Sequence, residues 1–526
     1  MKKNTNPVII GTRGSELALW QANLTKSILE KNGYQAELKI IKTKGDATQQ
    51  WNLSFDKMEG KGFFTKELED ALLSNEIDMA VHSCKDMPTE NAQGLTLTAF
   101  SKRANPFDIL LIRKEKVDRK SLLKLKQNAI VGTSSARRKA QLLALRPDFN
   151  IQDLRGNVPS RIHKLSEEKY DAIVLASAGI ERLNIDISAF EQVVLKAPAF
   201  IPAPAQGVLA FQIREADERM KEICSLLNDD KSAEIAAIER QILHDFEGGC
   251  QMPLGVYAEK IKEETHVWIS QAKAWNTFPK RKHVVLPNDE LNNIPKAIEP
   301  IVLSLKNSTP TAVFISSDLQ ENDYIVRGLK ALDYTVNYAT LIDFSPINFD
   351  LPKEIDWLFF SSKNGVKYFF DTVKNISPTI KIAAVNKGTA RAILELGYPV
   401  DFIGQGGDIA NVSQKFDETA NGKIIFIQAK NSLRSIQKSI SKNKDIHTLI
   451  VYENTPKASI KKRTEQILVF TSPMNVEAYL TNYPLEKNQS IISIGTSTSD
   501  RLKSLGYADV KTAFEPTYMS IMDEII

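Results

Sequence analysis

The sequence of 526 residues predicts an α/β protein that contains several domains. Short apolar runs alternate with segments in which apolar residues recur at helical spacing. Glycine and small hydroxyl residues follow several of the apolar runs, as at Gly11 and Gly132. The length exceeds what one hydrophobic core organises. We expect two α/β domains plus a small α+β domain in the N-terminal half, and two similar parallel-sheet α/β domains in the C-terminal half.

The composition narrows the class of protein. A hydrophobic content of 42% and a charged content of 25% are ordinary for soluble globular proteins. The net charge of +4 is small for this length and favours no nucleic-acid partner. No apolar run spans a bilayer or forms a signal sequence, and the six histidines show no zinc spacing. Three distant cysteines favour free thiols in a reducing cytoplasm. We therefore expect a cytoplasmic protein without a metal. We also expect a monomer, although the composition does not indicate the oligomeric state.

The N-terminus reads as a strand at residues 8–10, a tight loop and then a helix. Arg13 and Ser15 lie where the loop meets the helix, so a guanidinium, a hydroxyl and backbone N–H groups can bind an anion there. A plain helix cap by Ser15 is the alternative. Residues 56–67 form a polar loop with Lys57 and Lys61, which suits a mobile lid over an anionic ligand or a simple solvated loop.

Residues 77–81 predict a short buried strand that leads into Lys85 and Asp86. In open α/β sheets, ligands bind beyond the carboxyl ends of strands. A carboxylate at this place can move a proton or stabilise a cationic intermediate. The alternative is that Asp86 pairs with Lys85 or caps a turn.

Arginines recur near the ends of the next predicted strands. Residues 129–138 read as a strand, a glycine, hydroxyl residues and a helix with two arginines. Each guanidinium can hold a carboxylate through two parallel hydrogen bonds. The cluster therefore predicts a ligand with many carboxylates or phosphates, although any single arginine can be merely solvated. Its members are Arg137, Arg138, Arg155, Arg161 and Arg182.

Cys250 follows a predicted helix and two glycines. Apolar residues between 235 and 246 recur at helical spacing, and Gly248 and Gly249 end that helix. The thiol is then expected at a loop tip that faces a cleft. A buried, inert cysteine is the alternative. Upstream, the proline-rich segment 202–207 is expected to lead the chain back into the first domain.

Six spaced motifs resemble those of the porphobilinogen deaminases, also called hydroxymethylbilane synthases. They are residues 11–13, 81–88, 132–135, 154–158, 206–207 and 248–251, and the resemblance runs from about residue 8 to about residue 287. It implies two α/β domains like those of periplasmic binding proteins, plus a third domain. The family joins four porphobilinogen molecules head to tail, releases ammonia at each step and extends the chain on a dipyrromethane cofactor.

The resemblance also implies roles for individual residues. Cys250 holds the dipyrromethane cofactor through a thioether, and Asp86 with Lys85 serves catalysis. Phe107 and Ala205 depart from the family, which often has Arg and Gly at these positions. Cofactor and substrate carboxylates are bound by Arg13, Ser15, Lys85, Ser134, Ser135, Arg137, Arg138, Arg155, Arg161 and Arg182; Gln206 contributes to the substrate site, and Lys57, Lys61 and Phe64 belong to the mobile loop.

The second half follows a polar linker at residues 305–310 and contains an internal repeat. Residues 358–366 mirror residues 468–476, and residues 384–390 mirror residues 493–499. In each copy, an apolar run ends in small hydroxyl residues before a helix-like segment. Two similar parallel-sheet domains are therefore expected.

This half, from about residue 310 to residue 526, resembles uroporphyrinogen-III synthases, which close linear hydroxymethylbilane into a ring. The resemblance implies that Tyr452 helps the substrate hydroxyl to leave. Asn386 and Asn454 stand where the family has Gly and Thr. For Tyr452, the alternative is a packing role. For the serines and threonines of this half, the alternative is helix N-capping. The residues implied to bind carboxylates are Ser361, Thr389, Thr471, Ser472, Thr496 and Thr498.

Our main hypothesis is a bifunctional enzyme for two consecutive steps of tetrapyrrole synthesis, since tethering raises the local concentration of the second site. One alternative is a deaminase with a structural or partner-binding second half, and another is an anion-binding protein without chemistry.

The predicted domains are 1–104 with 197–219, 105–196, 220–304, 311–344 with 456–526, and 345–455, with 305–310 as the linker.

Overall fold

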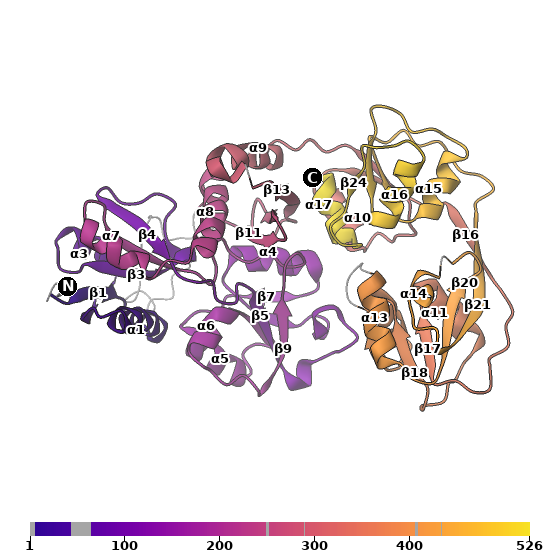
Figure 1. Ribbon diagram of the computed structural model, residues 1–526, viewed down its shortest axis with the longest axis horizontal. Helices are drawn as coiled ribbons and strands as arrows, with labels where there is room; N and C mark the ends of the chain where they lie inside the picture. Colours follow the sequence, from indigo (N-terminus) through magenta and orange to yellow (C-terminus); the bar gives the residue numbers. More distant parts are fainter. Residues whose placement is uncertain (1–5, 44–64, 249–251, 289, 405–408, 433) are drawn as a thin grey trace. The chain divides into compact units, whose positions relative to one another are not determined.

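The computed structural model describes residues 6–43, 65–248, 252–288, 290–404, 409–432 and 434–526 (Figure 1). The chain divides into two compact units, and the division lies between Thr309 and Pro310. Helix α9 (Ile294–Lys306) ends shortly before this division. None of the helices in the described ranges is long and apolar enough to cross a membrane.

The first unit begins with a five-stranded sheet in the order β2-β1-β3-β10-β4. Strand β1 is parallel to β2 and β3, whereas β10 is antiparallel to β3 and β4. Because β10 follows segment 202–207, the predicted return into the first sheet is confirmed. The elements are β1 (Val8–Thr12), α1 (Glu16–Lys31), β2 (Ala36–Ile40), α3 (Lys66–Leu73), β3 (Met79–Ser83), the 3-10 turn Cys84–Asp86, β4 (Leu95–Phe100), β10 (Leu209–Arg214) and α7 (Glu218–Ser225).

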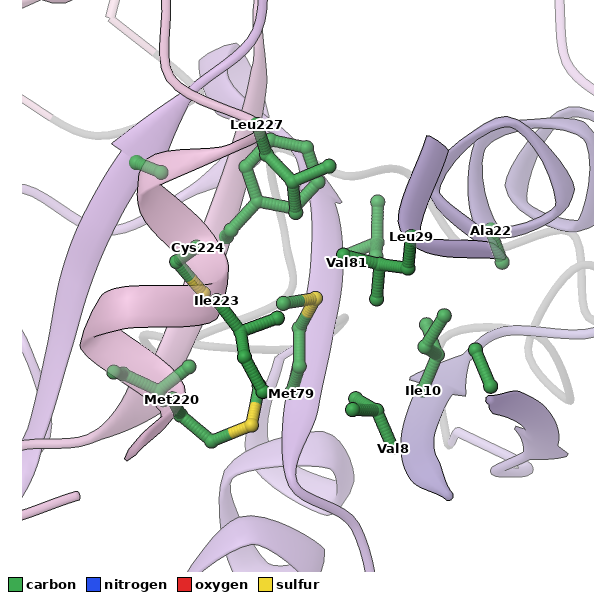
Figure 2. Close-up of a cluster of buried hydrophobic side chains, with 14 of the residues drawn as sticks. Val8, Ile10, Ala22, Leu29, Met79, Val81, Met220, Ile223, Cys224 and Leu227 are labelled. Atoms are coloured by element: carbon green, nitrogen blue, oxygen red, sulfur yellow. The ribbon is translucent and has the colours of Figure 1, made fainter. Parts of the chain in front are cut away.

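Helix α7 belongs to the core of this first sheet. Figure 2 shows Met220, Ile223 and Cys224 of α7 beside Met79 and Val81 of β3, and all five side chains are buried in one cluster. The third region therefore starts at α8 (Asp230–Asp245), ten residues after the boundary that the sequence suggests at residue 220. The apolar face of α7 explains the difference, because it covers the first sheet.

The second sheet repeats the layout of the first, in the order β7-β6-β8-β5-β9. Strand β6 is parallel to β7 and β8, and β5 is antiparallel to β8 and β9. Two α/β regions of the same design are therefore present, as expected. The elements are β5 (Asp108–Arg113), β6 (Ile130–Gly132), α4 (Ala136–Leu145), β7 (Asn150–Gln152), α5 (Val158–Ser166), β8 (Ala172–Ala176), α6 (Ser177–Arg182) and β9 (Phe190–Leu195), with 3-10 turns at Lys114–Lys116 and Leu122–Lys124.

The third region of this unit packs two helices with a three-stranded antiparallel sheet. Strands β11 (Leu254–Ile261), β12 (Glu264–Gln271) and β13 (Lys280–Leu286) pair in chain order. Helix α8 contacts β11 and α9. The helix predicted from the apolar spacing between residues 235 and 246 is confirmed as α8.

The second unit contains two sheets, in the orders β15-β14-β22-β23-β24 and β16-β21-β20-β17-β18-β19. All neighbouring strands are parallel except β16 and β21. The strands are β14 (Ala312–Ile315), β15 (Thr335–Tyr338), β16 (Ile342–Pro346), β17 (Trp357–Phe360), β18 (Lys381–Ala384), β19 (Phe402–Ile403), β20 (Lys423–Ala429), β21 (Asp445–Pro456), β22 (Ile467–Phe470), β23 (Ser490–Ser493) and β24 (Lys511–Thr512).

The internal repeat of the sequence is confirmed in this unit. Strand β17 leads into α11 with Ser362 as its N-cap, and β22 leads into α15 with Ser472 as its N-cap. The two copies lie in different sheets. The helices are α10 (Tyr324–Ala331), α11 (Lys363–Thr372), α12 (Lys387–Glu395), α13 (Ile409–Thr419), α14 (Ser435–Lys438), α15 (Pro473–Leu480), α16 (Thr496–Ser504) and α17 (Tyr518–Ile525).

Candidate functional site

Lys85 and Asp86 lie in the 3-10 turn that directly follows β3, at the sheet edge where the sequence places them. Asp86 is exposed and Lys85 is half-buried. Burial lowers the pKa of the Lys85 ammonium, and the charge of Asp86 opposes that shift. The turn is held from two sides, because Gln21 Nε2 donates to Ser83 Oγ (2.9 Å) and the N–H of Cys84 donates to the carbonyl of Val208 (3.0 Å).

A buried carboxylate, Asp108, holds both arginines of α4. Arg137 Nη1 donates to Asp108 Oδ2 (2.8 Å), and Arg138 Nη2 donates to Asp108 Oδ1 (2.6 Å). Gln206 Nε2 also donates to Oδ1 (3.0 Å), and Lys85 Nζ donates to Gln206 Oε1 (3.4 Å). The structure thus brings four predicted residues, Lys85, Arg137, Arg138 and Gln206, into one network around Asp108.

Arg161 lies within electrostatic range of the same network. Its pKa is lowered to about 10, chiefly by burial and also by the charge of Arg138, while the charge of Asp86 opposes the shift. Its Nε donates to the carbonyl of Gly156 (2.7 Å). The exposed carboxylate of Asp86 is therefore next to a set of cations, and it is available for proton transfer.

Three serines that the sequence predicts for this site, Ser15, Ser134 and Ser135, form hydrogen bonds with the backbone. Ser15 accepts from the N–H of Ala18 and caps α1, and Ser135 accepts from the N–H of Arg138 and caps α4. Ser134 Oγ contacts both backbone polar groups of Leu154, at 3.0 Å each. The capping alternative for Ser15 is thus observed, and any role of these serines toward a ligand stays a prediction.

The remaining arginines lie at other places along the strand ends. Arg13 follows β1, is half-buried, and its charge adds to the burial that lowers the pKa of His82. Arg182 Nη2 donates to the carbonyl of Gly207 (2.7 Å), and its guanidinium lies 5.8 Å from the Trp20 ring. Arg155 is half-buried in the loop after β7.

Two of the three cysteines are in the described part of the chain, and neither is suited to act as a nucleophile. Cys84 and Cys224 are fully buried, and burial raises their thiol pKa values to about 11 and about 12. A thiolate is the reactive form of cysteine, so both are inert. Cys250, Lys57, Lys61 and Phe64 lie outside the described residues.

The cluster around Asp108 fits a ligand with carboxylate groups. Arg138 is 6% exposed, and its Nε has no hydrogen-bond partner among the residues that the structure describes. A buried donor of this kind is costly unless something accepts its hydrogen bond. Among the described residues, no group of three or more His, Cys, Asp or Glu side chains could hold a metal ion.

The two departures from the family pattern in this half have structural consequences. The ring of Phe107 packs against Tyr257 of β11, with centroids 5.4 Å apart. Ala205 adopts a φ of 55°, a left-handed conformation that favours glycine. Its N–H donates to Glu239 Oε2 (2.6 Å), which keeps this peptide in place.

In the second unit, Tyr452 is 5% exposed in β21. Its hydroxyl lies 3.0 Å from Ser362 Oγ, and its ring stacks on Tyr368 at 5.3 Å. Burial raises the pKa of the Tyr452 phenol, with the Ser362 hydrogen bond acting in the opposite direction. The phenol is therefore neutral and can donate a proton. The packing that the alternative expects is observed as well.

The predicted hydroxyl residues of this unit lie at strand ends and helix starts. Thr471 accepts from Asn475 Nδ2 (3.3 Å) and donates to the carbonyl of Ser316, while Ser472 caps α15. Ser361 is half-buried before α11. In the first turns of α12 and α16, Thr389 and Thr498 are buried and Thr496 is exposed.

The two asparagines that depart from the synthase pattern have different places. Asn386 caps α12, because its Oδ1 accepts from the N–H of Thr389 (2.9 Å). Asn454 in β21 donates from Nδ2 to Met474 Sδ (2.7 Å). Asn386 therefore replaces a flexible residue by a side chain that itself satisfies the helix end.

Sequence reasoning missed Asp108 and Ser362. The only signal for Asp108 is an acidic residue that opens a strongly apolar strand, and such a residue needs a buried partner. Ser362 is the second of two adjacent serines, and the sequence does not tell which of them faces Tyr452.

Family models match three segments of the chain. The model described as "Porphobilinogen deaminase, dipyromethane cofactor binding domain" matches residues 8–222, and the model of the deaminase C-terminal domain matches residues 233–272. The model described as "Uroporphyrinogen-III synthase HemD" matches residues 323–523.

Curated relatives agree with the first two matches. A porphobilinogen deaminase of Nitratiruptor sp. is 47% identical over 253 residues, which are 48% of this chain and 79% of that protein. A porphobilinogen deaminase of Fusobacterium nucleatum is 45% identical over 279 residues, which are 52% of this chain and 90% of that protein.

Among solved structures, the uroporphyrinogen-III synthetase of Helicobacter pylori 26695 covers 41% of this chain and 98% of its own, with 23% identity and a TM-score of 0.33. The family matches and the two relatives carry the assignment. The chain belongs to the porphobilinogen deaminase family, and a uroporphyrinogen-III synthase domain follows its deaminase domains.

Proposed function

We propose that this chain catalyses two consecutive steps of haem biosynthesis. The first step joins four porphobilinogen molecules into hydroxymethylbilane and releases ammonia, and the second closes that product to uroporphyrinogen III. The observation that carries the first step is the cluster of Lys85, Arg137, Arg138 and Arg161 beside the exposed Asp86. Such a cluster suits a substrate whose carboxylates increase in number with each added unit.

In the first step, Asp86 accepts and donates the proton that moves when a porphobilinogen unit is joined. Its carboxylate is exposed, so a substrate can reach it. Lys85, in the turn after β3, and Arg161, in α5, bind carboxylates of the substrate. The dipyrromethane cofactor, when bound, supplies an electron-rich pyrrole that accepts the incoming unit. Arg137 and Arg138 hold its acidic side chains, with the Nε of Arg138 as an available donor.

We assign the attachment of the cofactor to Cys250. Cys84 and Cys224 are fully buried and have raised thiol pKa values, so neither supplies a thiolate near neutral pH. Cys250 follows α8, which packs against β11 of the third region. We also propose that Lys57, Lys61 and Phe64 cover the bound substrate.

In the second step, Tyr452 donates a proton to the hydroxyl that leaves. The phenol of Tyr452 is neutral, and its hydroxyl oxygen is held 3.0 Å from Ser362 Oγ. Neutral hydroxyl groups at the strand ends position the carboxylates of the substrate. These groups include Ser361, Thr471 and Ser472. Holding the folded substrate in one geometry supplies much of the rate.

Product analysis tests both steps together. Purified chain is given porphobilinogen, and the products are oxidised and separated into type I and type III uroporphyrins. Type III is expected in excess over type I. Consumption of porphobilinogen with type I alone would leave only the deaminase, and no consumption would refute the first step.

We also propose a cytoplasmic monomer. Cys84 and Cys224 are unpaired thiols, as a reducing compartment requires. Light scattering of the purified chain is expected to give a mass near 58.9 kDa, and a doubled mass would refute the monomer.

A further inference from the structure

Asp108 is the first residue of β5 and has no exposed surface. Burial opposes its ionisation, but the charges of Arg137 and Arg138 hold the pKa of the carboxyl well below its usual range. A buried carboxylate with two guanidiniums is stable only when the hydrogen bonds are complete. The Asp108 carboxylate accepts three side-chain donors, from Arg137, Arg138 and Gln206.

Each guanidinium is also fixed by a backbone carbonyl. Arg137 Nη1 donates to Ile201 (2.9 Å), and Arg138 Nη1 donates to Val174 (3.0 Å). These contacts, together with the two oxygens of Asp108, leave neither guanidinium free to turn. Their remaining donors therefore keep fixed directions, and one of them is the Nε of Arg138, which no described residue satisfies.

The same carboxylate reaches the catalytic turn through one side chain. Gln206 Nε2 donates to Asp108 and to the carbonyl of Pro106 (2.7 Å), while its Oε1 accepts from Lys85 Nζ. Lys85 is adjacent to Asp86. Asp108 thus joins α4 of the second sheet to the turn after β3 of the first sheet.

We propose that Asp108 is a positioning residue of the deaminase reaction, which orients Arg137 and Arg138 toward the carboxylates of cofactor and substrate and aligns Lys85 through Gln206. This inference rests on the proposed deaminase function. Asp108 does not touch the substrate itself. Its effect is on the placement of groups that do, and a displacement of about 1 Å at such groups can lower a rate by about 10²-fold.

The test compares Asp108→Asn with Asp148→Asn in the full chain. Asp148 is a matched control, because it also holds an arginine of the second sheet region, with Arg146 Nε and Nη2 each 2.7 Å from its oxygens, and it lies outside the network. Intact mass measures the fraction of molecules with the dipyrromethane increment. Steady-state kinetics give kcat and KM for porphobilinogen, referred to the loaded fraction.

For Asp108→Asn, we expect a lower loaded fraction and a KM that rises by about tenfold or more in the molecules that are loaded. Asp148→Asn is expected to keep the loading and the KM of the unchanged chain. A merely structural role would lower the unfolding temperature and leave the KM of loaded molecules unchanged, and that result would overturn the proposal.

Asp108→Glu covers the case in which Asp108→Asn fails to fold. It keeps the charge but displaces both guanidiniums, so positioning predicts a raised KM, whereas a wild-type KM would overturn it. The unchanged chain is measured in parallel. If it carries no cofactor increment and consumes no porphobilinogen, then the proposed function fails, not the role of Asp108 alone.

Discussion

The two units differ in the groups that they offer at the sites we propose for an acidic substrate. The first gathers charged side chains around buried Asp108, with Arg137 and Arg138 each held at less than 3 Å from it. The second unit has neutral hydroxyls at its strand ends. There, Thr471 donates a hydrogen bond to the carbonyl of Ser316, and Ser472 caps α15. In our proposal, the first unit therefore provides charge and proton transfer, and the second provides positioning.

This difference has an energetic consequence. Removing one member of a buried ion pair leaves a desolvated charge and costs about 3–5 kcal/mol. Removing one helix cap costs about 1 kcal/mol. The first unit should thus be far more sensitive to single substitutions at its site than the second.

Asp86→Asn should give the largest change. The exposed carboxylate carries the proton in our account, so porphobilinogen consumption should fall by about 10³-fold. The unfolding temperature should stay almost the same, because Asp86 is exposed. Closure of added hydroxymethylbilane should be unaffected. The matched control is Asp230→Asn, an exposed carboxylate at the start of α8, and an equal loss there would contradict the role of Asp86.

Tyr452→Phe should slow ring closure by about 10²-fold, since it removes the proposed proton donor. Type I uroporphyrin should then increase at the expense of type III, with porphobilinogen consumption unchanged. Tyr368→Phe removes the neighbouring phenol, which donates to the carbonyl of Phe344 (3.2 Å), and should leave the isomer ratio as it is. An unchanged ratio in Tyr452→Phe would reduce Tyr452 to a packing residue.

The pH dependence of stability should differ between the units. Burial lowers the pKa of His82 to about 4 from 6.5, so the unfolded chain binds more protons than the folded chain between these values. The free energy of unfolding of the first unit should therefore decrease by up to about 3 kcal/mol as the pH falls from 6.5 to 4. The only histidine of the second unit, His447, is exposed.

Thermal unfolding followed at several pH values measures this effect. His82→Gln keeps a donor for Gln212 Oε1, which lies 3.1 Å from His82 Nε2, but cannot take up the proton. Its first unit should show a shallower loss of stability between pH 6.5 and pH 4. An identical slope in both proteins would exclude His82 as the cause.

Ala205→Gly should give the smallest change, a gain of roughly 0.5–1 kcal/mol in the free energy of unfolding of the first unit. The residue has a φ of 55°, and glycine adopts that conformation without strain. Ala203→Gly is the control, because glycine there only adds freedom to the unfolded chain and should destabilise by roughly 0.5 kcal/mol. Denaturant unfolding distinguishes the two signs, and a loss in Ala205→Gly would show that its φ is unstrained.

The elements of the fold were predictable because they depend on local patterns. The spacing of apolar residues predicts α8, and the motif copies predict β17 with α11 and β22 with α15. The place of α7 was not predictable, since an apolar helix face does not say which sheet it covers. Figure 2 shows it on the first sheet.

The candidate site was predictable in its cations but not in what holds them. Glycine, hydroxyl and arginine patterns identify Arg137, Arg138 and Arg161 as neighbours of a strand end. Asp108 lies about 30 positions before Arg137 and Arg138 and 98 positions before Gln206. Only the pairing of β5 with β8 and the return of the chain toward β10 bring these segments together.

The intact mass of the purified full chain tests the central claim most directly, because that claim joins the cation cluster to a primer on Cys250. The chain should be heavier than its sequence by one dipyrromethane, and the increment should disappear in Cys250→Ser while Cys84→Ser and Cys224→Ser retain it. A chain whose mass equals that of its sequence, or an increment that survives Cys250→Ser, would contradict the account.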